Sequence, residues 1–292
     1  MKLLSYRTSD GESWGALVDG EIVDLATANP GWASLAAALA AALADAGTDG
    51  IVRAVTARAG TAPRLALDSV TLLPVVPAPG KILCVGLNFE KHRIETGRER
   101  TEHPVIFTRF PDTFVGHGTP LVRPAESERF DFEGELALVI GRGGRRIARE
   151  NALSHIAGVT CLNDGSIRDF QAHTHQFTPG KNFPATGSIG PWLVTLDDIG
   201  EIADLELVTR LNGVEVQRAP LSDLTYSIPE IVAYCSSWTQ LRPGDVIATG
   251  TPGGIGARRE PPLWMRPGDL CEVEVSGVGV LRNTITTEDV TP

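Results

Sequence analysis

The sequence predicts an α+β protein in which strands dominate. Apolar runs of strand length, such as 81–89, 104–110 and 136–140, alternate with turns rich in glycine and proline. Asp19-Gly20 and Asn212-Gly213 each separate two strand-like segments, and this residue pair is typical of a tight hairpin. The chain has no regular alternation of strands and helices, and it has neither a GxGxxG nor a P-loop motif. A doubly wound nucleotide-binding fold is therefore not indicated.

The chain divides into a small first part and a larger second part. Strands are expected in the first 28 residues, and helices at 32–46 and about 50–58. The segment TLLPVVPAPG at 71–80 carries three prolines and a glycine, a composition typical of a linker. We therefore predict a small α+β N-terminal domain at 1–74 and a main domain at 75–292.

The main domain should contain one longer helix and several strands. The segment 148–159 has apolar residues at helical spacing, which predicts a helix. A hairpin is expected at 205–217. Pro-Gly-Asp turns lead into strand patterns within 241–252 and 265–285.

Composition and charge exclude several classes of function. With 36 acidic and 26 basic residues, the net charge of −10 is unsuited to binding nucleic acid. The longest apolar run, at 35–44, is too short to span a membrane, and no signal peptide is evident after Met1. The four cysteines lack metal-site spacing, so we expect them to be reduced and buried in a cytoplasmic protein.

Two acidic residues stand at the start of a buried strand pattern, FDFEGELALVI at 130–140. Glu133 and Glu135 would share one face of a strand, because side chains alternate along it. Two carboxylates so placed repel each other and raise each other's pKa, and a bound cation removes that cost. Gly134 between them would allow a close approach to the backbone. The pattern favours a divalent metal site.

A third carboxylate is available from NDGSIRDFQ at 163–171. If a short helix begins here, Asp164, Arg168 and Gln171 lie on one face. Ligation by oxygen alone favours Mg²⁺, Mn²⁺ or Ca²⁺ over Zn²⁺. The alternative is that Asp164 only caps the helix and pairs with Arg168, and on spacing alone this is the commoner arrangement.

Three further features offer groups for catalysis. His92 and Glu95 would be adjacent on a helical turn, where the carboxylate orients the imidazole as a base; the alternative is a solvated charged loop. Lys181 in PGKNFP would stabilise an oxyanion near a metal, although such a lysine is more often simply exposed. The turn ATGTPGGIG at 248–256 offers backbone N–H groups and Thr251 to a carboxylate, unless it is only a structural turn.

These stretches, in this order, resemble the fumarylacetoacetate hydrolase family from about residue 75 to the C-terminus. The resemblance is carried by KILCVGLNFEKH, FDFEGELALVIG, NDGSIRDFQ, GKNF and LRPGDVIATGTPGGIG. Several motifs in the correct order are far more specific than any single motif. The first part resembles the short N-terminal domain that many bacterial members carry.

The resemblance implies a mixed β-sandwich roll, a homodimer, and a bound Mg²⁺ or Mn²⁺. It assigns Glu133, Glu135 and Asp164 to the metal, and His92 and Glu95 to a catalytic dyad on a lid. It further assigns catalysis to Lys181 and substrate contacts to Arg168, Gln171, Thr251 and Gly250.

Two positions depart from the family pattern. Gly165 stands where a bulkier residue often follows the aspartate, and Arg109 stands where a lysine is common. Both are expected near the pocket, where they would bear on which substrate is bound. Arg93, Arg98 and Arg109 are candidates for binding a second substrate carboxylate.

The residues and the resemblance together favour an acylpyruvate-type hydrolase. In this reading the metal holds a 2,4-dioxo acid, His92 activates water, and a C–C bond breaks to leave the enolate of a pyruvate-like fragment. If the dyad only relays a proton, the same site would serve a 2-oxo acid decarboxylase or a 2-hydroxydienoate isomerase. A non-catalytic protein stabilised by Ca²⁺ is the alternative outside enzymes.

Overall fold

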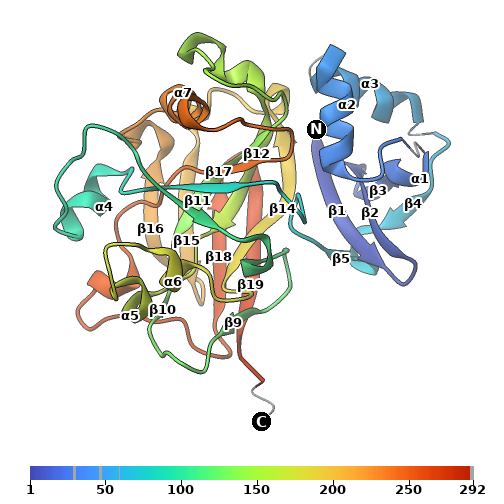
Figure 1. The fold of residues 1–292 in the computed structure, drawn as a ribbon. Coiled ribbons are helices and arrows are strands. Elements are labelled where there is room, and N and C mark those ends of the chain that lie inside the picture. Colours follow the sequence, from blue (N-terminus) through green and yellow to red (C-terminus); the bar gives the residue numbers. More distant parts are fainter. Residues whose placement is uncertain (29–30, 46–47, 59, 290–292) are drawn as a thin grey trace.

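The computed structural model describes residues 1–28, 31–45, 48–58 and 60–289. It confirms the predicted α+β class with a dominance of strands (Figure 1). The largest sheet has twelve strands in the order β4-β3-β2-β1-β14-β12-β11-β17-β6-β7, with β5 beside β1 and β8 beside β14. These strands are β1 (Lys2–Thr8), β2 (Gly11–Val18), β3 (Glu21–Asp24), β4 (Arg64–Ala66), β5 (Thr71–Leu72), β6 (Ile82–Gly86), β7 (Val105–Arg109), β8 (Phe114–Val115), β11 (Gly134–Ile140), β12 (Ile156–Asn163), β14 (Gly187–Thr195) and β17 (Val246–Ala248).

A second sheet and a short ribbon complete the strands that the structure describes. The second sheet has the order β16-β15-β18-β19-β9. Its strands are β9 (Leu121–Arg123), β15 (Glu206–Leu211), β16 (Val214–Pro220), β18 (Leu270–Val275) and β19 (Gly279–Thr287). The ribbon pairs β10 (Phe130–Asp131) with β13 (Ser166–Ile167). The described α-helices are α1 (Leu25–Ala28), α2 (Leu35–Asp45), α3 (Thr48–Arg58), α4 (Glu90–Glu95), α5 (Arg168–Gln171), α6 (Thr178–Lys181) and α7 (Ile228–Trp238).

Strand β11 lies at the centre of the large sheet and is buried along its whole length. Leu136, Leu138 and Ile140 point to a core shared with β15, β18 and α7. Ala137 and Val139 point to the opposite face, which α2 covers. Because both faces are covered, the strand is apolar at successive positions instead of alternating.

The first part of the chain joins the main body through the large sheet. Strand β1 pairs antiparallel with β14, with Leu3 opposite Leu193. Leu3 and Trp14 belong to the same hydrophobic cluster as Val139 of β11. Figure 1 shows the N-terminal elements, in blue, beside β14. The boundary between residues 74 and 75 remains a proposal.

Both predicted hairpins are present. Asp19-Gly20 connects β2 to β3, and Asn212-Gly213 connects β15 to β16. All four of these residues have positive φ, between 53° and 83°. This conformation suits the right-handed twist of the paired strands, and asparagine, aspartate and glycine tolerate it best.

The predicted helix at 148–159 is wrong. Arg149–His155 forms a short 3-10 helix, and the chain then enters β12 at Ile156. Strand β12 lies between β11 and β14, so all eight of its residues are buried. The strand pairs with a neighbour on each edge and is buried on both faces. Such a strand needs no alternation of apolar and polar residues, so its sequence can show the apolar spacing of a helix.

Two expectations from composition can be compared with the structure. The four cysteines are free and buried, as predicted. Their thiol pKa values are raised by burial, to about 12 for Cys235. Of the helices that the structure describes, none combines the length and apolar character needed to cross a bilayer.

Candidate active site

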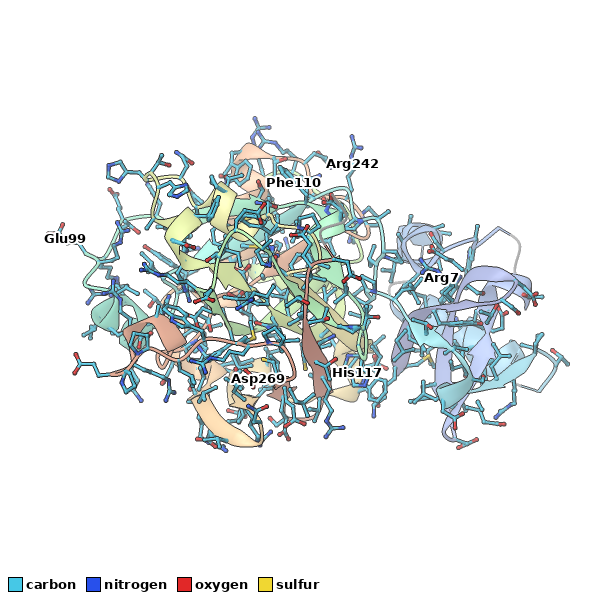
Figure 2. The ribbon with its side chains drawn as sticks, turned by 90° about the horizontal axis from the view of Figure 1, so that it is seen from below. Arg7, Glu99, Phe110, His117, Arg242 and Asp269 are labelled. Atoms are coloured by element: carbon cyan, nitrogen blue, oxygen red, sulfur yellow. The ribbon has the colours of Figure 1, made fainter. Side chains whose placement is uncertain are left out.

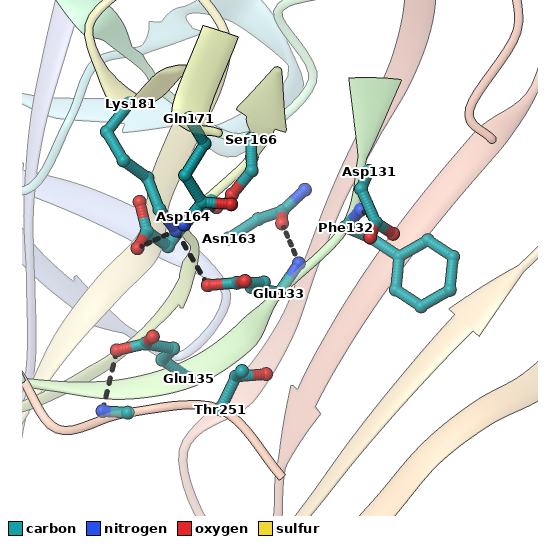
Figure 3. A network of polar contacts seen from close by, with 12 residues as sticks. Asp131, Phe132, Glu133, Glu135, Asn163, Asp164, Ser166, Gln171, Lys181 and Thr251 are labelled. Carbon is teal, nitrogen blue, oxygen red and sulfur yellow. Dashed lines mark hydrogen bonds and ion pairs between the residues drawn. The ribbon is translucent and has the colours of Figure 1, made fainter. Parts of the chain in front are cut away.

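Three buried carboxylates meet where β11 begins and β12 ends. Glu135 belongs to β11, Glu133 immediately precedes that strand, and Asp164 immediately follows β12. The backbone N–H of Asp164 donates to the Glu133 carbonyl at 2.8 Å, which holds the two residues side by side. One carboxylate oxygen from each of the three residues lies within 4.8 Å of the others. Figure 3 shows the three groups turned toward one another.

The local backbone differs from the prediction at two points. Residues 130–140 are not one strand, because β10 ends at Asp131 and β11 begins at Gly134. Asp164 is not a helix cap, since α5 begins at Arg168 and Ile167 precedes it in extended conformation. The alternative, an ion pair between Asp164 and Arg168, is also wrong. Arg168 instead contacts Asp131 and Glu133.

The two glycines singled out beside the carboxylates have structural roles. A Cβ on Gly134 would lie 2.0 Å from the Thr209 hydroxyl oxygen, so the close approach is made by a side chain of β15. A Cβ on Gly165 would lie 2.0 Å from the Thr186 carbonyl oxygen. Neither position can hold a larger side chain without moving its neighbours.

Lys181 lies among the carboxylates and neutralises two of them. Its Nζ lies 2.7 Å from Glu133 Oε2 and 2.6 Å from Asp164 Oδ2, and it is buried. Burial alone would lower the lysine pKa, but Asp164 and Glu133 raise it above its usual value. The amine therefore stays protonated near neutral pH. The alternative that Lys181 is an exposed loop residue is wrong.

Two arginines complete the positive charge around the site. Arg109 donates from Nη1 to Asp164 Oδ1 at 2.7 Å, and Arg168 donates from Nη1 to Glu133 Oε1 at 2.6 Å. Arg168 also donates from Nε to Asp131 Oδ2 at 2.8 Å. Glu133 and Asp164 thus each have two cationic partners.

Glu133 and Glu135 have opposite electrostatic environments. Burial opposes ionisation of Glu133, but Lys181 and Arg168 outweigh it and lower the pKa to about 2. Burial raises the pKa of Glu135 well above its usual value, and the charges of Asp164 and Glu133 raise it further. The described residues place no cationic group at ion-pair distance from Glu135. Its Oε2 accepts only the backbone N–H of Gly250, at 2.8 Å.

The donor set fits a hard divalent cation. All three candidate ligands are carboxylates, which suit Mg²⁺ or Mn²⁺, or Ca²⁺, better than Zn²⁺. The raised pKa of Glu135 also fits, because a buried carboxylate beside two others is costly to ionise without an added positive charge.

The predicted dyad forms on α4. His92 Nδ1 lies 2.8 Å from Glu95 Oε1, and His92 is buried. The other Glu95 oxygen, Oε2, accepts the backbone N–H of Gly254 at 2.8 Å. The glycine-rich turn therefore holds the carboxylate that orients the histidine. The alternative of a solvated loop with an incidental histidine does not describe this geometry.

One cavity brings most of the predicted residues together. It has a volume of ≈ 230 Å³, below the usual range for drug-sized ligands, so it suits only a small metabolite. Residues of the predicted set that line it are His92, Glu133, Glu135, Arg168, Gln171, Lys181 and Thr251. Glu95, Asp164 and Gly250 are not in its lining but contact the lining residues His92, Lys181 and Glu135, respectively. These contacts place the residues but leave their roles as predictions.

The substrate-contact candidates are held by polar partners. Gln171 Oε1 accepts from Arg168 Nη1 at 2.9 Å. Thr251 Oγ1 accepts from Gln217 Nε2 at 2.8 Å, and Gln217 Oε1 accepts the backbone N–H of Gly134. Gln217 thus links the turn to the start of β11. No spacing in the sequence indicates Gln217, because it belongs to β16 in the other sheet.

Two more residues of the site are absent from the predicted set. Asp131 accepts from Arg168 and from the backbone N–H groups of Gly256 and Ala257. Its position two residues before Glu133 could have indicated it. Arg258 lines the cavity from the 3-10 helix Gly256–Arg258, which follows the glycine-rich turn.

The three arginines that were candidates for binding a second substrate carboxylate lie in different environments. Arg98 lines the cavity. Arg93 instead pairs with Glu90, and Arg109 is buried against Asp164 behind the cavity wall. The expectation that Arg109 reads a substrate carboxylate is therefore wrong, because the Asp164 carboxylate already occupies it.

Comparisons with known proteins find related sequences and structures. Residues 81–286 match the family model described as fumarylacetoacetate (FAA) hydrolase C-terminal. Over 223 residues the chain is 41% identical to oxaloacetate tautomerase YisK of Bacillus subtilis (strain 168), covering 75% of this chain and 74% of that protein.

Two solved structures extend the comparison over nearly the whole chain. A 5-carboxymethyl-2-hydroxymuconate delta-isomerase from Mycobacterium smegmatis has a TM-score of 0.77 and 30% identity, covering 99% of each chain. A maleylpyruvate hydrolase from Sphingobium sp. SYK-6, in complex with manganese (II) ion and pyruvate, has a TM-score of 0.80 and 27% identity. It covers 99% of this chain and 100% of that chain.

Proposed function

Because the chain belongs to the fumarylacetoacetate hydrolase family, we propose that it is an enzyme that acts on a small 2-oxo acid through an enolate. The observation that carries this proposal is the cluster of Glu133, Glu135 and Asp164 beside Lys181 and the His92–Glu95 dyad. We also propose that the enzyme is a homodimer, on the family resemblance alone.

Glu133, Glu135 and Asp164 would hold a divalent cation. Mg²⁺ and Mn²⁺ are the ions we favour, and the Sphingobium relative contains manganese. When bound, such an ion acts as a Lewis acid that polarises the 2-oxo group and orients the neighbouring carboxylate.

The chain's own donors would stabilise negative charge on the substrate. Lys181 is held protonated by its two carboxylate partners. Arg168 has one buried nitrogen, Nη2, without a hydrogen-bond partner in the described structure. Gln171 lies beside Arg168 on the same helix. Donors fixed before the substrate arrives need no reorganisation when charge develops on oxygen.

The dyad would move the proton. The Glu95 carboxylate accepts from His92 Nδ1, which leaves Nε2 of the neutral ring as the base. Glu95 is itself fixed by Gly254, so the ring has one preferred orientation. His92 lines the cavity, where a substrate carbon or a water molecule can reach it.

Keto–enol tautomerisation of a 2-oxo acid is the reaction we favour. A single base suffices, since the proton leaves C3 and returns to oxygen, or the reverse, with no bond to water. The 41% identity to an oxaloacetate tautomerase supports this reaction over the hydrolysis that the sequence alone favoured. Hydrolytic C–C cleavage is the second candidate, supported by the maleylpyruvate hydrolase neighbour and by the same dyad. Decarboxylation would use the same enolate.

The deciding experiment compares His92→Ala and wild-type enzyme in Mg²⁺ with enol-oxaloacetate and with acylpyruvates, and identifies the products. We expect wild-type enzyme to ketonise the enol, and the variant to lose about 10²–10⁴-fold in kcat, the usual contribution of a positioned base. Mg²⁺ affinity should stay near wild type, since His92 is not a ligand.

His175→Ala is the matched control, because His175 is exposed and outside the cavity lining. Cleavage of an acylpyruvate without ketonisation would favour the second candidate. Equal turnover by His92→Ala and wild type would contradict the assigned role of the dyad. Absence of turnover with every 2-oxo acid would favour the non-catalytic alternative.

A further inference from the structure

The mouth of the cavity carries two arginines that the proposed reaction does not use. Arg98 follows α4, and Arg258 ends the 3-10 helix Gly256–Arg258. Both residues line the cavity, and both are exposed. Neither is found in an ion pair within the part of the chain that the structure describes. Their positive charge is therefore available to a ligand.

The two arginines belong to the two segments that meet over the cavity. Arg258 donates from Nη2 to the Thr96 carbonyl at 3.3 Å, at the end of α4. The backbone of Arg98 is held by Arg93, whose Nη1 donates to the Arg98 carbonyl at 2.6 Å. Figure 2 shows the neighbouring Glu99 projecting from the edge of the molecule. The arginines thus lie at the outer end of the cavity.

The acidic residues of the cavity lie at its inner end, and the two arginines lie at its mouth. The acids in its lining, Glu133 and Glu135, are buried at the inner end beside Lys181. The cavity lining also includes apolar residues, among them Phe107 and Phe177. A ligand that fits has a 2-oxo acid group at the inner end, a short carbon chain, and a second negative group at the mouth.

We propose that Arg98 and Arg258 bind the second carboxylate of the substrate and select 2-oxo dicarboxylic acids over 2-oxo monocarboxylic acids. This inference rests on the proposed function and narrows its substrate class. Guanidinium groups suit the task because their parallel N–H groups match the two oxygens of a carboxylate. The other candidates, Arg93 and Arg109, already have carboxylate partners within the protein.

The test measures binding of two matched pairs of ligands by calorimetry in saturating Mg²⁺. The pairs are oxaloacetate with 2-oxobutanoate and 2-oxoglutarate with 2-oxopentanoate, which differ only by a carboxylate in place of a methyl group. The proteins are wild type, Arg98→Ala, Arg258→Ala, the double variant, and Arg98→Lys.

We expect the wild-type protein to bind at least one dicarboxylate more tightly than its partner, with each alanine variant losing about tenfold for that ligand. Binding of the monocarboxylates should change less than twofold. Arg98→Lys should recover part of the lost affinity, since lysine keeps the positive charge but lacks the parallel N–H groups of a guanidinium. Arg100→Ala is the control, because Arg100 is exposed but does not line the cavity.

The possible failures are distinguishable. If dicarboxylates and monocarboxylates bind wild-type protein equally, or if the double variant keeps the preference, the arginine site is wrong while the proposed function stands. If none of the four acids binds the wild-type protein, the proposed function and the arginine site both fail.

Discussion

Glu135 has no cationic partner among the described residues, whereas Glu133 and Asp164 each have two. The site contains three cationic groups and four acids. The cations are Arg109, Arg168 and Lys181, and the acids are Asp131, Glu133, Glu135 and Asp164. One negative charge is therefore left over when all four acids are ionised. Ionisation is least favourable at Glu135, and the pKa of its carboxyl is raised in the folded state. Two properties of this one residue can be measured.

The first prediction concerns pH in the presence of a chelator. A carboxyl whose pKa is raised on folding binds its proton more tightly in the folded state, so its contribution to stability is lost as pH rises. The unfolding free energy of metal-free protein should therefore fall above about pH 5, by up to about 1.4 kcal/mol per pH unit. Glu135→Gln should remove this fall, as followed by guanidinium unfolding between about pH 5 and 8.

The exposed carboxyl of Glu126 supplies the control for the pH experiment. Glu126→Gln should keep the wild-type slope. A Glu135→Gln protein whose stability still falls with the wild-type slope would show that another group is responsible.

The second prediction concerns the cation. Ligand binding to the folded state stabilises it, by about 2.7 kcal/mol at a hundred times the Kd. Mg²⁺ or Mn²⁺ should therefore raise the Tm of the wild-type protein by several degrees in a thermal melt. Glu135→Ala should abolish the rise and Glu126→Ala should not. A wild-type Tm that is the same with and without these ions would argue against the site.

The sequence is informative about residues that share a motif and silent about partners from distant segments. Glu133, Glu135 and Asp164 could be recognised because each stands in a motif with a fixed order. The contact of Arg109 with Asp164 spans 55 residues, and that of Gln217 with Thr251 spans 34. Such contacts depend on which strands become neighbours, and local spacing does not specify this.

At the scale of elements, two short helices position the catalytic candidates by close packing. A Cβ on Gly180 of α6 would lie 2.3 to 2.5 Å from backbone and Cβ atoms of Gln171 in α5. Glycine therefore allows the two helices to touch, which brings Lys181 beside Glu133, the carboxylate that Arg168 also contacts. The sequence motifs GKNF and RDFQ mark these residues but do not reveal that the segments are in contact.

Gly180→Ala should separate α5 from α6. We expect a loss of about 1–3 kcal/mol in unfolding free energy from the overpacking. We also expect at least a tenfold fall in kcat/KM, since a small displacement of Lys181 weakens its contacts with the substrate. Gly200→Ala is the control, because a Cβ there meets nothing within 4 Å. Wild-type kinetics in Gly180→Ala would mean that the helix contact does not position the lysine.

Elements were predicted well where local rules decide them and poorly where pairing decides them. The two hairpins follow from Asp19-Gly20 and Asn212-Gly213, whose positive φ angles are a local property. The helix expected at 148–159 is interrupted at Ile156 by strand β12, because β11 and β14 pair with this strand on both sides. Its apolar run is compatible with either structure when both faces are buried.

At the scale of the whole molecule, the N-terminal strands extend the sheet that holds the site. Ser5 donates from Oγ to the Val75 carbonyl at 2.9 Å, and Leu73 donates to the Ser5 carbonyl at 3.0 Å. Leu35 and Leu39 of α2 belong to the cluster that includes Val139 of β11. The composition of the linker segment predicted a boundary but could not predict that one sheet continues across it.

Deleting residues 1–74 should therefore destabilise the remainder. The deletion exposes the edge of β14 and the apolar face of the sheet around Val139, and such surfaces promote aggregation. We expect residues 75–292 alone to be largely insoluble, or to melt far below the full chain, as measured by gel filtration and thermal unfolding. A truncated chain that is monodisperse with the full-length Tm would establish an independent domain at the proposed boundary.

The pairing of β1 with β14 also has a consequence during synthesis. Leu193, the partner of Leu3, is made about 190 residues after it, which takes roughly 10–40 s at ribosomal rates. During that interval β1 can pair with β2 on one edge and, at Tyr6 and Arg7, with β5 on the other, but the part of that edge that contains Leu3 has no strand to join. The nascent chain therefore carries an open strand edge until most of the protein has been translated.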